Sequence, residues 1–270
     1  MPGIAAGDTR RHALGLEYDG GGFVGWQSQG GERAVQSELE AALSRVADEP
    51  VAVVAAGRTD AGVHAAGQVV HFDVHCERTH YGWLRGANSN LPDDIAVTWV
   101  RGVTGEFHAR YSATARHYRY LVCERRSRPV LARRHAAWSY RELDVERMQQ
   151  AADTLLGEHD FSAFRGAHCQ AHSPVRTLHE LRVAREDGWI SIDVTANAFL
   201  YHMVRNLVGT LLMVGQGEAD TAWPARVLAG RDRRRAGPTA PAAGLTLMGA
   251  EYPQRFGLPP VVSPRLPHAL

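Results

Sequence analysis

Strand and helix patterns follow one another in a similar order in the two halves of this 270-residue chain. Apolar residues that alternate with polar ones predict half-buried strands, and apolar residues three or four positions apart predict amphipathic helices. The expected strands cover residues 13–18, 52–56, 70–74, 95–100, 118–122 and 190–194, and the expected helices cover residues 34–46, 145–156 and 201–214. Since a half-buried sheet is covered by helices on its apolar face, this order predicts two α+β sandwiches.

The length of the chain allows two domains of ordinary size. We expect residues 1–11 to form a flexible N-terminus, residues 12–112 an N-terminal α+β subdomain and residues 113–252 a C-terminal one. Residues 105–112 read as the crossover between the two halves. The last segment, residues 253–270, is rich in proline and is expected to be an irregular tail on the surface.

Composition argues for a protein of the cytoplasm. No run approaches the roughly 20 apolar residues that a membrane-spanning helix needs. The first twelve residues contain two arginines but no apolar stretch behind them, so no signal peptide is expected. The three cysteines (Cys76, Cys123 and Cys169) are odd in number and widely spaced, which is unlike a disulfide framework and favours a reducing compartment.

The net charge of +1 conceals a strong asymmetry along the chain. Residues 1–100 carry 7 Arg against 13 Asp and Glu, whereas residues 101–147 carry 11 Arg against 5 acidic residues. A second basic cluster consists of Arg231 and residues 233–235, and the chain contains no lysine. Arginine forks suit phosphate contacts and stacking on bases, so both basic segments are candidate RNA-binding surfaces. Compositional bias of the genome also accounts for the preference for arginine.

The most informative motif is the segment GRTDAGVHA at residues 57–65, between two expected strands. Asp60 would therefore sit on a short connection from a rigid sheet, with glycines on both sides that permit close approach of a ligand. Arg58 is near enough in sequence to neutralise Asp60 or to bind a phosphate. The structural alternative is a turn in which the aspartate caps backbone amides.

Two other groups of residues suggest cofactor or metal sites only weakly. His71, His75, Cys76 and His80 do not have the spacing of the usual structural zinc sites. The glycines at residues 20–22 and 30–31 form neither a P-loop nor a dinucleotide-binding fingerprint. We therefore expect no metal and no cofactor.

Further motifs along the chain resemble those of the TruA family of tRNA pseudouridine synthases. In addition to residues 57–65, the matching segments are Tyr18-Asp19-Gly20, Phe23, Gly25-Trp26-Gln27, residues 68–72, 88–95, 107–110, 112–113, 116–120, 161–164, 176–177, 197–200, 202–206, Ala240-Pro241 and Gly244-Leu245. They occur in the family's order and cover about residues 12–252.

The resemblance implies a fold, an activity and partners. The fold would consist of two similar ferredoxin-like or RRM-like α/β sandwich subdomains, with mostly antiparallel sheets joined across a central catalytic cleft. The activity would be the isomerisation of uridine to pseudouridine at positions 38, 39 and 40 in the anticodon stem-loop of tRNAs, without a cofactor. Family members act as homodimers on tRNA, so neither DNA nor a membrane is an expected partner.

The resemblance also assigns roles to single residues. Asp60 would be the essential nucleophile, acting either at C6 of the base or at C1′ of the ribose. A buried carboxylate stays ionised only beside a cation, and Arg205 matches the family's partner arginine. Tyr118 would stack on the extruded uracil. Arg58 would hold the flipped nucleotide, and Leu245 would line the pocket.

Two alternatives remain open at this point. An RNA-binding protein that has kept the fold but lost catalysis should lack one or more of Asp60, Arg58, Tyr118 and Arg205, and all four are present. A hydrolase could instead use Asp60 with His64 as a general base. Such an enzyme would need a water-positioning or metal site, and the sequence offers none.

Overall fold

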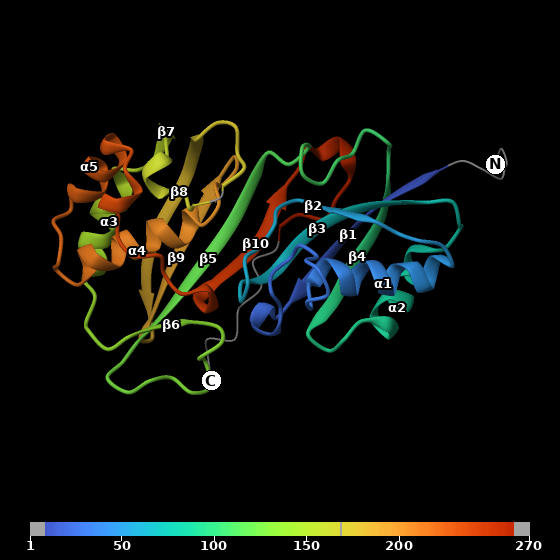
Figure 1. Ribbon diagram of the computed structural model, residues 1–270, viewed down its shortest axis with the longest axis horizontal. Coiled ribbons are helices and arrows are strands. Elements are labelled where there is room, and N and C mark those ends of the chain that lie inside the picture. Colours follow the sequence, from blue (N-terminus) through green and yellow to red (C-terminus); the bar gives the residue numbers. More distant parts are fainter. Residues whose placement is uncertain (1–8, 168, 262–270) are drawn as a thin grey trace. The chain divides into compact units, whose positions relative to one another are not determined.

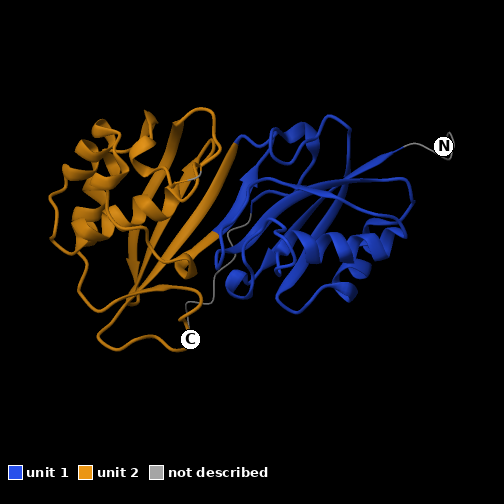
Figure 2. Ribbon diagram, viewed as in Figure 1, with its two compact units in different colours: residues 1–114, 247–264 blue, residues 115–246, 265–270 orange. Residues whose placement is uncertain are grey.

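A computed structural model describes residues 9–167 and 169–261 of the chain. The described chain divides into two compact units (Figure 2). Unit 1 comprises residues 9–114 and 247–261, and unit 2 comprises the described residues between 115 and 246. Each unit contributes its own strands and helices, and each is described by itself.

The sheet of unit 1 has strand β3 (His64–Val74) near its middle (Figure 1). Strand β1 (Arg10–Tyr18) lies between β3 and β4 (Ile95–Val103) and pairs antiparallel with both. The short β2 (Val53–Ala55) also pairs antiparallel with β3. Strand β10 (Leu245–Glu251) comes from the far end of the chain and stands next to β3 in the strand order.

Two helices, α1 (Val35–Ala47) and α2 (His80–Asn90), pack side by side in unit 1 (Figure 1). Leu39 and Leu43 of α1 have no exposed surface, in agreement with the apolar stripe expected for this helix. On α2 the main anchor is Trp83, whose ring lies edge-on to Phe72 of β3 at 5.1 Å between centroids. These contacts bury the face of the sheet that includes Phe72.

The other face of the unit 1 sheet is covered by irregular chain. Phe107 and Ala109 pack with Ala13 and Val69 in a second buried cluster, which also includes Phe256. The segment that the sequence suggested as a crossover is therefore part of the core. Because both faces are covered, this sheet is buried more completely than the half-buried pattern predicted.

Unit 2 contains a sheet in the order β5 (Ala115–Glu124), β9 (Trp189–Ala196), β8 (Val175–Glu186) and β7 (Gly157–Asp160), in which neighbouring strands are antiparallel. A short strand, β6 (Ala137–Ser139), pairs with β5 in the parallel direction.

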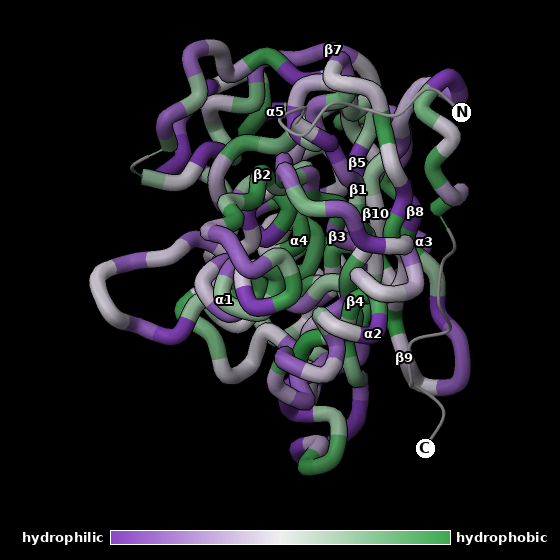
Figure 3. Tube along the Cα trace, turned by 90° about the vertical axis from the view of Figure 1, so that its right-hand side faces the viewer, coloured by the Kyte–Doolittle hydropathy of each residue, from purple (hydrophilic) through white to green (hydrophobic). Residues whose placement is uncertain are grey.

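The helices of unit 2 are α3 (Val145–Asp153), α4 (Met203–Gly215) and α5 (Trp223–Gly230). Figure 3 shows α4 among the predominantly hydrophobic segments, and the apolar stripe expected on it is buried at Met203, Val204, Leu207, Val208 and Leu211. The described chain also contains short 3₁₀ turns at Gly20–Gly22, Ser162–Phe164, Arg233–Arg235, Ala242–Gly244 and Gln254–Phe256.

The α+β fold with mostly antiparallel sheets is confirmed, and two details differ from the expectation. Strand β1 begins at Arg10 rather than Ala13, because Arg11 is held by a two-pronged ion pair with Asp73 on β3; only residues 1–8 of the proposed flexible N-terminus lie outside the described residues. Residues 247–261 group with unit 1 rather than with the second half of the chain.

None of the helices in the described ranges is long and apolar enough to cross a membrane. Of the proline-rich tail, residues 262–270 lie outside the described residues, and residues 254–256 form a single 3₁₀ turn.

Candidate active site

Asp60 lies in unit 1 on the connection from β2 to β3, as expected, and is partly exposed. The Gln68 side chain donates to the carbonyl of Gly57 at 2.7 Å. The hydroxyl of Thr59 is hydrogen-bonded to that of Tyr18 at 2.8 Å, and the backbone N–H of Val63 donates to the carbonyl of Asp60 at 3.1 Å. The loop is therefore anchored to the sheet at Gly57 and Thr59, just before Asp60, and the bond from Val63 closes a turn after it.

A close backbone approach fixes the outer side of the same loop. Gly25 forms an isolated antiparallel bridge with Asp60, and the N–H of Trp26 donates to the carbonyl of Thr59 at 3.0 Å. Gly25 has a φ of +118°, and a Cβ there would stand 2.8 Å from the Thr59 carbonyl oxygen. Only glycine fits this position without moving the loop.

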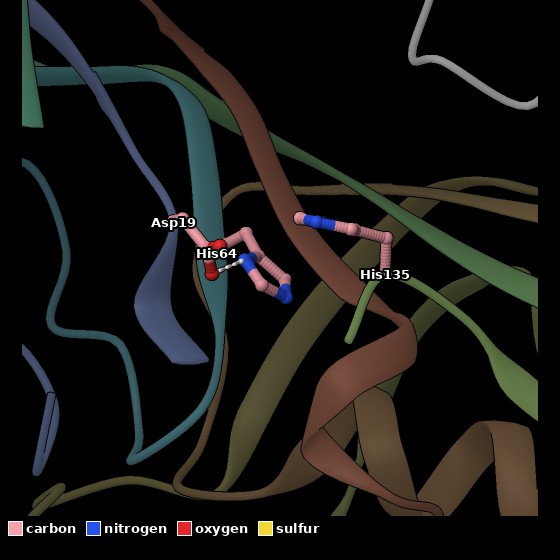
Figure 4. A group of neighbouring side chains, drawn as sticks. All are labelled: Asp19, His64 and His135. Carbon is pink, nitrogen blue, oxygen red and sulfur yellow. Dashed lines mark ion pairs between the residues drawn. The ribbon is translucent and has the colours of Figure 1, made fainter. Parts of the chain in front are cut away.

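His64 follows the loop as the first residue of β3 and is 4% exposed. Its Nδ1 lies 3.0 Å from the backbone N–H of Gly20 and 3.1 Å from a carboxylate oxygen of Asp19 (Figure 4). The same Asp19 oxygen accepts from the N–H of Gly21 and so caps the 3₁₀ turn. These contacts give His64 a structural role in joining β3 to the turn after β1.

Arg58 is exposed beside this loop. Its position leaves a cation at the surface two residues before Asp60, where a phosphate of a bound nucleic acid could be held. Unit 1 thus supplies a carboxylate on a rigid connection with an exposed guanidinium next to it.

In unit 2, Tyr118 lies on β5 and is 8% exposed. Its ring is edge-on to that of Phe199, with 5.1 Å between centroids and 87° between planes. Tyr120 points to the same side of the strand, is fully buried, and donates its hydroxyl to the carbonyl of Pro241 at 2.9 Å. Burial raises the pKa of Tyr120 above its usual value.

Arg205 lies near the start of α4 and is partly buried, as expected for a residue beside the apolar stripe. Its Nε donates to the carbonyl of Ala240 at 2.8 Å, and the N–H of Ala240 donates back to the Arg205 carbonyl at 3.1 Å. The bonds from Arg205 to Ala240 and from Tyr120 to Pro241 together hold the segment that leads to Leu245.

Leu245 is 5% exposed at the first position of β10. The preceding Gly244 has no room for a side chain, because a Cβ would stand 2.7 Å from the ring of Tyr120. The Gly-Leu pair is therefore set by close packing on β5.

Comparisons with known proteins identify the family. A family model described as tRNA pseudouridine synthase matches residues 16–112 and 151–253. A protein named tRNA pseudouridine synthase A from Nitrosococcus oceani is 53% identical over 254 residues, which cover 94% of this chain and 98% of the relative. One of the same name from Methylococcus capsulatus is 54% identical over 248 residues, or 92% of each chain. The chain belongs to the tRNA pseudouridine synthases.

Among solved structures, a Cbf5–Nop10–Gar1 complex aligns with a TM-score of 0.36 and 11% identity, over 87% of this chain and 48% of that chain.

In this tRNA pseudouridine synthase, the histidines that the sequence suggested as weak zinc candidates have other partners. His71 accepts from the N–H of Ala109 at 3.1 Å, and His80 accepts from the N–H of Gly102 at 3.0 Å. His75 lies 3.0 Å from a carboxylate oxygen of Glu49. Each side chain stabilises a different part of unit 1.

Arg233, one of the residues suggested for RNA binding, has a structural role. It is partly buried, and its guanidinium donates to Gly237, Asn206 and Thr239 at 2.9, 2.9 and 3.0 Å. Burial lowers its pKa. A run of arginines in sequence did not distinguish this residue from Arg234 and Arg235, which are exposed.

Tyr18, Gln68 and Gly25 lie in the sequence motifs, but no role was predicted for them. In the structure they hold the Asp60 loop. Tyr18 and Gln68 reach the loop through the pairing of β1 with β3, and Gly25 reaches it from the segment after β1, so no local sequence pattern reveals these contacts.

Proposed function

We propose that this enzyme isomerises uridine to pseudouridine at positions 38, 39 and 40 in the anticodon stem-loop of tRNA, with Asp60 as the nucleophile. As a member of its family, the protein is an isomerase that forms pseudouridine in tRNA. The observation that carries the assignment of Asp60 is its loop, which is anchored at Gly57, Thr59 and Asp60 to neighbouring strands and turns. A carboxylate held in this way is preorganised for attack.

The reaction breaks the bond from N1 of the base to C1′ of the ribose, turns the base, and forms a bond from C5 to C1′. The proton on C5 is lost and N1 gains one, so no group donor and no redox cofactor is required. Asp60 serves as the nucleophile at C6 or at C1′, and both routes need its ionised form.

The remaining roles follow the family motif residue by residue. Arg205 is assigned as the cation that favours the ionised form of Asp60. Tyr118 is assigned to stacking on the uracil and Leu245 to lining its pocket; both are almost fully buried, as a site that retains a detached base requires. Arg58 is exposed and is assigned to the phosphate of the flipped nucleotide.

A stem of A-form RNA is recognised through its shape and backbone, so exposed cations are the expected tRNA contacts. The loop between β5 and β6 exposes Arg125, Arg126, Arg128, Arg133 and Arg134. We assign this loop, together with Arg234 and Arg235, to the tRNA surface. We also infer a homodimer, since symmetry doubles such a basic surface, and a cytoplasmic location, where tRNA is available.

Position choice can be tested with an unmodified tRNA transcript that has uridine at positions 38, 39 and 40. After incubation with the enzyme, carbodiimide adducts of pseudouridine are mapped by primer extension. We expect primer-extension stops that mark these three positions. No such stops should appear when the three uridines are replaced by cytidine. Pseudouridine confined to another arm of the tRNA would contradict the proposed substrate site.

A further inference from the structure

The Asp60 loop rests on two buried side chains that have no part in the chemistry described above. Tyr18, the last residue of β1, is 5% exposed, and Gln68 of β3 has no exposed surface. Strands β1 and β3 are paired antiparallel, which brings both side chains beneath the loop. A buried polar group must find hydrogen-bond partners, and both find theirs in the loop.

Two hydrogen bonds join these side chains to the loop. The phenolic oxygen of Tyr18 lies 2.8 Å from the hydroxyl of Thr59, and either group can be the donor. The Gln68 side chain donates to the carbonyl of Gly57 at 2.7 Å, two residues before Thr59. Thr59 itself is 7% exposed. One buried phenol thus connects the sheet to the residue that immediately precedes Asp60.

The protonation state of the phenol suits this role. Burial raises the pKa of Tyr18 to about 12, so the hydroxyl keeps its proton throughout the neutral range. Ionisation of the phenol therefore does not disturb its hydrogen bond to Thr59 in this range. The ring is also held in place, with its centroid 6.2 Å from that of Trp26, the residue whose N–H donates to the Thr59 carbonyl.

We propose that Tyr18 is a positioning residue for catalysis, whose hydroxyl fixes Thr59 and thereby the direction of the Asp60 carboxylate. The proposal rests on the proposed role of Asp60. Tyr18 does not contact the substrate, and its effect on the reaction is transmitted through the backbone from Thr59 to Asp60. Small displacements of a reacting group are costly, so loss of this anchor should slow the chemical step more than it weakens binding.

The direct test is Tyr18→Phe, which removes only the hydroxyl. We expect a fall of about tenfold in kcat on tRNA, with KM changed by less than about twofold. Thr59→Val removes the other hydroxyl at nearly constant volume and should lower kcat to a similar extent. Because both changes break the same bond, the double variant should be no slower than about the slower single variant. Thr59→Ser keeps the hydroxyl that bonds Tyr18 and should therefore keep most of the activity.

Tyr252→Phe is the matched control. The hydroxyl of Tyr252 donates to the carbonyl of Ala109 at 2.7 Å, also within unit 1, and Ala109 is not part of the Asp60 loop. It should lose thermal stability comparable to Tyr18→Phe and keep the wild-type kcat. Melting temperature and tRNA affinity are measured for every variant, so that slow chemistry is separated from unfolding.

An unchanged kcat in Tyr18→Phe, or a kcat that falls only in proportion to the folded fraction, would overturn the proposal. A rise in KM at constant kcat would also overturn it, since Tyr18 would then serve binding. Asp60→Ala in the same assay distinguishes failure of the positioning role of Tyr18 from failure of the assignment of Asp60 as nucleophile. If Asp60→Ala is inactive and Tyr18→Phe is normal, only the positioning role fails; if Asp60→Ala remains active, the assignment of the nucleophile fails.

Discussion

His12 and His71 are buried on opposite faces of the unit 1 sheet, at 7% and 4% exposure. His12 stacks on Phe72 and has no hydrogen-bond partner for either ring nitrogen among the described residues, whereas His71 faces Phe107 and His108. Burial, reinforced for His12 by His80 and Arg10 and for His71 by Arg11, lowers the pKa of each imidazole to about 4. Both rings are therefore neutral in the folded protein at pH 7.

These lowered pKa values predict a loss of stability in acid. Between pH 6.5 and 4 the unfolded chain binds protons that the folded chain does not, so the free energy of unfolding falls as the pH falls. The loss from pH 7 to 4 should be on the order of 2–3 kcal/mol per histidine. In His12→Leu, the part of this loss that comes from His12 should disappear. The free energy of unfolding is measured by urea denaturation at both pH values. The exposed His179→Leu is the control, and an equal pH effect in His12→Leu and wild type would contradict the account.

At the scale of elements, the sequence predicted those with a regular pattern. The helices with clear apolar stripes, α1, α3 and α4, were found within a few residues of their expected bounds. Helix α2 was missed because it buries only Trp83 and Ala87 and contains two glycines. Strand β8 was missed because an irregularity between Leu178 and Glu180 interrupts its alternation, and β10 because six successive residues are buried.

The residues of the candidate site also differ in whether the sequence alone could predict them. Asp60 and the other matching residues could be proposed from sequence because their motifs are contiguous. The residues that hold the Asp60 loop in place could not, because Tyr18, Gly25 and Gln68 act through contacts between separate strands and turns.

The loop around Asp60 offers a prediction at this scale. Gly25→Ala places a Cβ against the Thr59 carbonyl oxygen, and because that atom is backbone the loop itself must shift. We expect kcat to fall by about tenfold or more. Gly31→Ala is the matched control, because Gly31 also has a positive φ (+93°) but no atom within 4 Å of its added Cβ. Both variants carry backbone strain. If both had the same kcat, displacement of the Asp60 loop could not be the cause of a fall in kcat in Gly25→Ala.

At the scale of the whole molecule, the near-neutral net charge hides an uneven distribution of arginine, and the structure separates structural arginines from exposed ones. Arg119 pairs with Asp193, and Arg233 is bonded within unit 2. Arg126 and Arg128 are exposed on the loop between β5 and β6. The exposed arginines are the ones expected to meet tRNA phosphates.

Changing both Arg126 and Arg128 to Ala should therefore weaken tRNA binding and reduce its dependence on salt. If each makes one phosphate contact, the slope of log affinity against log salt concentration should become shallower by about 2. The control is Arg226→Ala, which removes an exposed arginine paired with Asp220 at 2.8 Å. A slope unchanged from that of the wild type would remove this loop from the tRNA interface.

The central claim is that Asp60 carries out uridine isomerisation, and tritium release from tRNA labelled at C5 of uridine tests it most directly. Wild-type enzyme is compared with Asp60→Asn, which keeps the size of the side chain but removes its charge. The account predicts release by the wild type, none by the variant, and nearly equal tRNA affinity for both. Release by Asp60→Asn at the wild-type rate, or no release by either protein while both bind tRNA, would contradict it.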